Sequence, residues 1–170
     1  LANNAGLTLV EDKALLGEVA GLAEYPVVLM GSFDEEFLDI PSEALTSAMR
    51  THQKYFSLKD NKGNLANKFI FVSNMKTKDN GAKIIDGNER VLRARLSDTK
   101  FFWDQDLKSK LADHLPALND IVFHAKLGTV GARVKRLEIL SGYIAELISA
   151  DVEKAKFAAK LSKSDLVTGM

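Results

Sequence analysis

The sequence of 170 residues contains no cysteine. This absence excludes disulfide bonds, cysteine-bound zinc and thiol catalysis, and it suits a reducing cytoplasm. Long hydrophobic runs are also missing. The longest apolar runs are short, like Val27–Met30, whereas a membrane-spanning helix needs about 20 apolar residues. We therefore expect a cytoplasmic protein that neither spans a membrane nor uses cysteine chemistry.

An excess of charge of either sign is missing as well. The 23 basic and 23 acidic side chains cancel. Bulk DNA or an anionic membrane is therefore not an expected partner, and any contact with nucleic acid must be a local patch. Hydrophobic residues make up 46% of the chain, enough for one packed domain or one domain plus part of another. The sequence starts without Met and ends at "KSDLVTGM", so we expect a piece of a longer protein.

The first half of the chain mixes strand and helix patterns. Residues 11–25 carry apolar side chains at helical spacing, and residues 26–33 form a short apolar run that is typical of a buried strand. A second helix is expected to begin at Ser42. Residues 54–74 predict a hairpin, because two strand-like runs flank "KDNKGN", which contains the Asn and Gly of a chain reversal.

From Asn80 onward the pattern is almost entirely helical. Helices are expected over residues 82–107, 109–118, 129–148 and 151–166. The predicted fold class is α+β, with a small mixed or antiparallel sheet and helices in the N-terminal half, then a long helix and an all-helical C-terminal part. The loop around 119–129 divides the chain into two expected domains, 1–120 and 121–170.

Apolar residues recur every three or four positions in the expected helix 129–148. This spacing predicts that one face of the helix lies in the core. The residues predicted to be buried there are Val130, Val134, Leu137, Leu140 and Ile144.

Catalytic motifs are absent from the sequence. His52, His114 and His124 lack metal-ligand spacing, and each is more commonly structural or exposed. No Gly-x-Ser-x-Gly element and no phosphate loop ending in Gly-Lys-Ser/Thr occurs. The acidic run "FDEEFLD" has the chemistry to hold a divalent ion, although a solvated turn is the commoner role of such a run. The motifs alone therefore assemble no catalytic site and no metal site.

Two basic stretches are candidates for contact with RNA. "MRTHQKYF" places Arg50 and Lys54 beside Tyr55, a mixture of charge and aromatic rings that RNA-binding surfaces use. "GARVKR" places Arg133 and Arg136 three positions apart on a helix. Ordinary solvated charge is the alternative interpretation of both stretches.

The long helix carries three arginines within six positions. On a helical wheel of about 100° per residue, Arg95 falls in the middle of the apolar stripe, whereas Arg90, Arg93 and Lys100 fall outside it. Arg95 is therefore predicted to be largely buried in a structural role. An unpaired buried charge would cost several kcal/mol, so Arg95 is expected to have a partner. Asp98, one turn further along the helix, is the nearest candidate. The other three cations are left as an exposed strip.

Several stretches, taken in order, resemble one known family. They are "GLAEYPVVLMGSFDEEFLDIPSEALTSAMRTHQKYFSLKD", "FVSNM", "GNERVLRARLSDTKFFWDQDLK", "VFHAKLGTVGARVKRL" and "AAKLSKSDLVTGM". Together they resemble the beta subunit of bacterial tetrameric glycyl-tRNA synthetase. The resemblance covers nearly the whole chain from about Gly21.

The resemblance implies an α2β2 enzyme that uses ATP to charge tRNA with glycine. The alpha chain would form the adenylate with ATP and magnesium, so no cofactor and no catalytic residue are expected in this piece. The implied partners are the alpha subunit and the tRNA for glycine, with no DNA and no membrane. Residues 1–120 would be similar to the B3/B4 modules of the phenylalanyl-tRNA synthetase beta chain. Residues 121–170 would open an HD-like helical domain that is associated with the acceptor end of tRNA.

We interpret the chain as a scaffold that helps to bind tRNA. Its candidate tRNA-binding residues are Arg50, Lys54, Arg90, Arg93, Lys100, Arg133 and Arg136. One alternative is a metal-dependent phosphohydrolase of the HD type with His124 and Asp165 as ligands, although the sequence lacks the His-Asp pair of that class. The other alternative is a purely structural interaction module.

Overall fold

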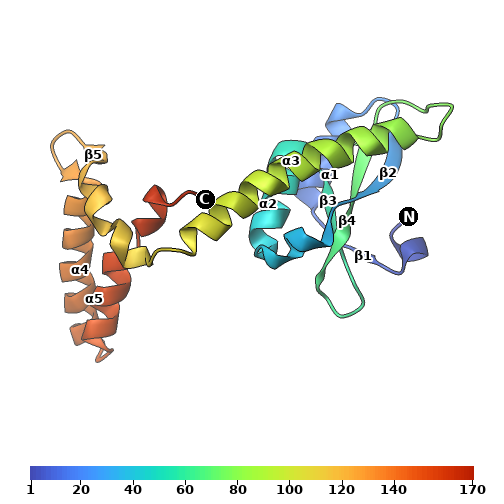
Figure 1. Ribbon diagram of the computed structural model, residues 1–170. Helices are drawn as coiled ribbons and strands as arrows, with labels where there is room; N and C mark the ends of the chain where they lie inside the picture. Colours follow the sequence, from blue (N-terminus) through green and yellow to red (C-terminus); the bar gives the residue numbers. More distant parts are fainter. The chain divides into compact units, whose positions relative to one another are not determined.

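A computed structural model describes all 170 residues. It consists of two compact units, Leu1–Phe101 and Phe102–Met170, each of which is described by itself (Figure 1). The division falls inside the long helix, earlier than the expected boundary after residue 120. The reason is that the segment Leu111–Asn119 packs on later helices of the second unit. No helix is both long and apolar enough to cross a membrane.

The first unit is built on an antiparallel sheet, as the α+β prediction requires. Its strand order is β1-β3-β4-β2, so β4 lies inside the sheet and pairs with β2 and β3. The predicted hairpin 54–74 is confirmed as β3 and β4. Asp60 Oδ1 accepts the Asn64 amide at 2.9 Å in its turn, where Gly63 has a φ of 86°. The strands are β1 (Thr8–Leu9), β2 (Val27–Ser32), β3 (Phe56–Lys59) and β4 (Leu65–Ser73).

Helices cover one face of this sheet. The side chains of β4 point alternately to the two faces of the sheet. Phe69 and Phe71 point into the core between the sheet and these helices. The Phe69 ring stacks on Tyr55 with 4.5 Å between centroids. Gly31 of β2 leaves room for this ring, because an added Cβ would lie 2.6 Å from its Cζ atom. The covering elements are η2 (Glu35–Asp39), α2 (Ser42–Gln53) and α3 (Ala82–Asp106), whose Leu45, Met49, Leu92 and Leu96 are fully buried.

The opposite face of the sheet carries a smaller core. Ile70, between the two phenylalanines of β4, points to this side. It meets Leu15 and Val19 of α1 (Lys13–Leu22) and residues of the N-terminal segment, which includes η1 (Asn3–Ala5). The sheet is therefore buried on both faces, and β4 contributes to both cores.

The second unit is mainly helical. Its small core contains Leu118, Val130 and Val134. Helices α4 and α5 lie side by side in Figure 1 and pack on each other. The elements are η3 (Leu111–Asn119), β5 (Val122–His124), β6 (Gly128–Thr129), α4 (Val130–Leu147), α5 (Val152–Leu161) and η4 (Ser164–Val167).

The predicted core stripe of α4 is only partly correct. Val130 and Val134 are buried and Leu137 is half-buried, but Leu140 and Ile144 are exposed. The helix instead turns Gly142 and Ala145 inward. A Cβ at Gly142 would lie 2.6 Å from Cε of Lys156 on α5, so the close contact of the two helices depends on small residues. The prediction placed the large residues Leu140 and Ile144 on the packing face, which is formed here by small residues.

We expect Phe69→Ala to destabilise the first unit strongly. Phe69 is fully buried against Tyr55 and Phe71, and truncation of a buried phenylalanine costs about 3–5 kcal/mol. The matched control is Leu22→Ala, since Leu22 is 65% exposed and exposed substitutions change stability by about 0.5 kcal/mol or less. Urea unfolding followed by circular dichroism measures both changes. Equal costs for the two variants would contradict the assignment of this core.

Candidate functional site

The structure holds Arg50 and Lys54 in ion pairs that link α2 to α1. Arg50 Nε lies 2.5 Å from Asp12 Oδ2, and Lys54 Nζ lies 2.6 Å from Glu18 Oε1. Asp12 also accepts the Leu15 amide at 2.8 Å, which caps α1. The hydrogen bond from Arg50 lowers the pKa of Asp12 and the bond from the Leu15 amide adds to this effect. Both cations therefore already have a carboxylate partner.

The cations of α3 are paired in the same way. Arg90 Nη2 lies 2.6 Å from Asp86 Oδ2 one turn earlier, and Arg93 Nε lies 2.7 Å from Asp34 Oδ2. The hydrogen bond from Arg93 lowers the pKa of Asp34. Glu89, which precedes Arg93 by one turn, instead accepts hydrogen bonds from the amide and hydroxyl of Ser32. The contacts of Glu89 and Arg93 join α3 to the chain around β2 and η2, whereas the Arg90–Asp86 pair lies within α3.

Lys100 lies further along α3. It is partly exposed, like its neighbour Thr99, whose hydroxyl donates to the Arg95 carbonyl at 2.9 Å.

The prediction that Arg95 is buried is wrong. Arg95 is exposed, and neither Asp98 nor another carboxylate forms an ion pair with it. The buried stripe of α3 is centred on Leu92 and Leu96, whereas exposed Val91 and Phe102 had drawn the centre of the predicted stripe toward Arg95. Arg95 therefore lies beside the buried stripe rather than within it.

The positive charge of Arg95 affects the pKa of the buried Tyr55 hydroxyl. Tyr55 donates to Asn88 Oδ1 at 2.6 Å. Burial raises the pKa of Tyr55 to about 12, and the positive charge of Arg95 opposes that rise. Tyr55 is consequently neutral at physiological pH.

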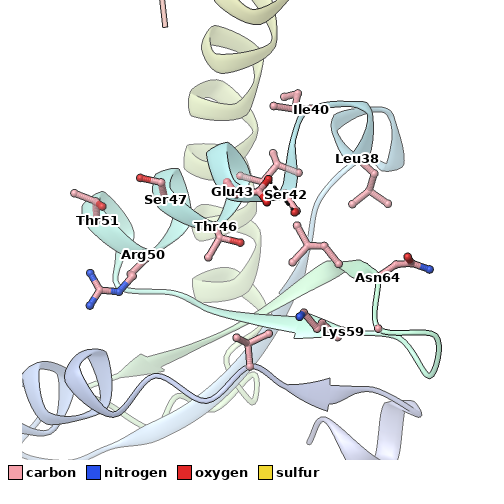
Figure 2. A pocket seen from close by; sticks show the side chains of 14 residues that line it. Leu38, Ile40, Ser42, Glu43, Thr46, Ser47, Arg50, Thr51, Lys59 and Asn64 are labelled. Carbon is pink, nitrogen blue, oxygen red and sulfur yellow. Dashed lines mark hydrogen bonds between the residues drawn. The ribbon is translucent and has the colours of Figure 1, made fainter. Parts of the chain in front are cut away.

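A hollow of about 760 Å³, lined by both polar and apolar side chains, lies between α2 and the β3–β4 hairpin. Figure 2 shows that Thr46, Ser47 and Arg50 line it from α2, with Lys59 and Asn64 on the opposite side. Its hydroxyl, amide and cationic groups are able to bind a polar ligand. No histidine lines it, so it holds no serine–histidine pair of the kind that activates a nucleophile.

The hydrolase alternative finds no ligand set in this structure. No group of three or more His, Asp or Glu side chains is placed to hold a metal ion. His124 lies in β5, where its Nδ1 accepts the Lys126 amide at 3.2 Å. Asp165 lies in η4. These two residues therefore do not form part of a metal cluster.

The start of α4 carries cations that are arranged differently. Thr129 Oγ1 accepts the Ala132 amide at 3.1 Å and caps the helix, and the preceding chain folds into the β5–β6 hairpin. The guanidinium carbon of Arg133 lies 4.3 Å from the centroid of the Phe123 ring, in a cation–π contact. Neither Arg133 nor Arg136 forms an ion pair with a carboxylate, and Arg136 is exposed.

Sequence reasoning missed the hairpin and Phe123. The segment 119–129 was expected to be a loop. Two signals were present in "VFHAKLGT": the apolar pair Val122 and Phe123, and a turn that ends in Gly128. Gly128 has a φ of 84°, the left-handed conformation that favours glycine. We call Phe123, Lys126, Arg133 and Arg136 the hairpin surface.

We expect Arg93→Ala to lower the melting temperature slightly at pH 7, and Arg95→Ala to leave it nearly unchanged. Arg93 stabilises the Asp34 carboxylate, whose pKa lies below its ordinary value. That contribution is present above the ordinary value of about 4 and is lost as the pH falls below it. The difference between native and Arg93→Ala proteins should therefore shrink toward pH 3 in calorimetry. A larger effect of Arg95→Ala would contradict the observed pairing.

Comparison with known proteins supports one family. The family model for the glycyl-tRNA synthetase beta subunit matches residues 1–170. The glycine–tRNA ligase beta subunit of Rhodospirillum centenum is 54% identical over 99% of this chain and 24% of its own length. The corresponding subunit of Aeromonas hydrophila is 53% identical over 94% of this chain and 23% of its own length. That of Ruegeria sp. is 50% identical over 98% of this chain and 25% of its own length.

The chain thus spans about a quarter of the length of these relatives. The family match nevertheless extends from the first residue to the last and includes both compact units. The chain belongs to the glycyl-tRNA synthetase beta-subunit family.

Proposed function

We propose that this chain forms part of the tRNA-binding surface of a glycine–tRNA ligase, with the hairpin surface as the point of contact. The observation that carries the proposal is the stack of Arg133 on Phe123, in which the guanidinium has no carboxylate partner. The relatives are glycine–tRNA ligase beta subunits, which suggests the ligase and its tRNA substrate. The contact is located at the hairpin because Arg133 stacks on Phe123 there.

The chemistry of the hairpin surface suits RNA without base pairing. Single-stranded nucleotides stack on aromatic rings and on guanidinium planes, while cations follow the phosphates. Phe123 is 40% exposed. Lys126, in the turn of the hairpin, and Arg136, three positions after Arg133, are exposed cations. A base is able to extend the Phe123–Arg133 stack while Arg136 meets a phosphate.

The cations of the first unit are weaker candidates. A phosphate that bound Arg50, Lys54, Arg90 or Arg93 would compete with the carboxylate already bound to that cation. The phosphate would gain less free energy there than at an arginine without an ionic partner. We therefore assign Arg50, Lys54 and Arg93 to links between elements of the unit. Arg90 is assigned to an ion pair within α3. Lys100 of α3 is kept as a candidate for contact with tRNA.

We further propose that this chain holds no catalytic residue and that a separate alpha subunit forms the adenylate with ATP and magnesium. In support, no histidine lines the hollow beside α2, so no serine–histidine pair is present there, and the sequence has no phosphate loop. The partners in this proposal are the alpha subunit and the tRNA for glycine.

Substitution of the hairpin surface should weaken binding of tRNA by the intact ligase. Loss of one stacked base costs about 1–3 kcal/mol, so Phe123→Ala and Arg133→Ala should each raise KM for tRNA by roughly 5- to 150-fold. Combined charge reversal of Arg133 and Arg136 should do the same, and adenylate formation should be unchanged in every variant. The matched control is Arg95→Ala, an exposed arginine of the other unit. Native KM in the hairpin variants would refute the proposal.

The 170-residue chain alone should show no glycine-dependent exchange of ATP and pyrophosphate. The reason is that the proposal assigns the adenylate site to the other subunit. The assay needs protein free of alpha subunit, with the intact ligase as the positive control. Exchange at the rate of the intact ligase would contradict the division of labour between the chains.

A further inference from the structure

We propose that a further helix of the same polypeptide, outside these 170 residues, packs on an apolar face of α4. This apolar face consists of Ile139, Leu140, Tyr143, Ile144 and Leu147. Their side chains are 47% to 73% exposed. The proposal is separate from tRNA binding and concerns what covers this face in the whole beta chain.

The apolar face lies opposite the side of α4 that is already packed. At about 100° per residue, its five residues fall within an arc of roughly 140°. Gly142 and Ala145, which are buried, fall on the other side, where Gly142 meets Lys156 of α5. A helix that is apolar on both sides is normally buried on both sides. The helix α4 therefore has the composition of a central element with one partner missing.

The size of the second unit leads to the same conclusion. The unit contains 69 residues (102–170), yet its buried cluster is limited to Leu118, Val130 and Val134. Small domains bury a low fraction of their surface and are only marginally stable. Large contiguous apolar patches on soluble proteins mark a contact surface. A further packed helix would supply the core that this unit lacks.

The length of the relatives identifies the occupant. The matched relatives share only 23% to 25% of their own length with this chain, so about three quarters of such a polypeptide lies elsewhere. The spacing of the five residues, at intervals of three and four, is the pattern that receives a packed helix. RNA is not the occupant expected here, because none of the five residues is a cation. Arg136 of the hairpin surface lies one turn before the face begins.

Oxidative footprinting of the full-length beta chain within the intact ligase tests whether the face is covered. The three tyrosines of these 170 residues provide the scale. Tyr143 is 60% exposed here and Tyr55 is 3% exposed. If the face is covered, Tyr143 should react as slowly as Tyr55, with protection of at least about tenfold relative to the urea-unfolded chain. Rapid oxidation of Tyr143 in the native ligase would overturn the proposal.

Photo-crosslinking identifies the occupant. A benzophenone amino acid replaces Tyr143 in ligase assembled from equal amounts of isotopically light and heavy beta chains. The expected adduct joins the benzophenone at position 143 to a peptide of the same chain beyond these 170 residues. Both crosslinked peptides should then carry the same isotope label, light with light or heavy with heavy. Mixed products would identify a second copy, and adducts on the alpha subunit or on tRNA would identify those partners. Each of these results would refute the proposal.

A substitution pair gives an independent readout. Leu140→Glu places a charge on the apolar face, and it should lower the unfolding temperature of the full-length beta chain by several degrees. Lys135→Glu is the matched control, since Lys135 lies on the exposed polar part of the same helix. Equal unfolding temperatures for the two variants would contradict a covered face. Neither variant alters Phe123 or Arg133, so failure here leaves the tRNA measurements interpretable.

Discussion

The burial of strand β4 on both faces is the constraint on which the first unit depends. Phe69 and Phe71 point into one core, and Ile70 points into the other. Because both faces must be covered, helices have to be held on each side of a sheet that offers them mainly apolar contacts. Ion pairs between elements supply additional links: Asp12 with Arg50 between α1 and α2, and Asp34 with Arg93 onto α3. These ion pairs therefore join elements that pack on the sheet.

The candidate cations of the chain fall into two classes. In the first unit, the arginines that seemed best placed for RNA are partners of carboxylates from neighbouring elements or turns. In the second unit, the hairpin β5–β6 holds Phe123 under Arg133, and no carboxylate completes the pair. A phosphate that binds a paired cation has to displace a carboxylate, at a cost of up to about 1 kcal/mol for an exposed pair. An unpaired cation beside an aromatic ring demands no such cost and offers both charge and stacking. The proposed role in tRNA binding rests on this difference.

The sequence predicted the architecture better than the burial of single residues. The α+β class, the hairpin and the long helix are all present, because turn residues and helical periodicity are local signals. Burial depends on what packs against an element, and local patterns do not contain that information. In α3, exposed Val91 and Phe102 carried as much weight as buried Leu92, so Arg95 was misplaced. In α4, Gly142 forms the close contact and Leu140 is exposed, because a small residue allows helices to approach.

Crosslinking of tRNA to the intact ligase, with the modified peptides identified by mass spectrometry, tests the central claim most directly. The account predicts that, within these 170 residues, crosslinks fall on the hairpin and the first turns of α4, at Phe123, Lys126 or Arg136. Crosslinks concentrated instead at Arg50, Lys54 or Arg93 would show that RNA displaces the carboxylates of the first unit, and would contradict the account.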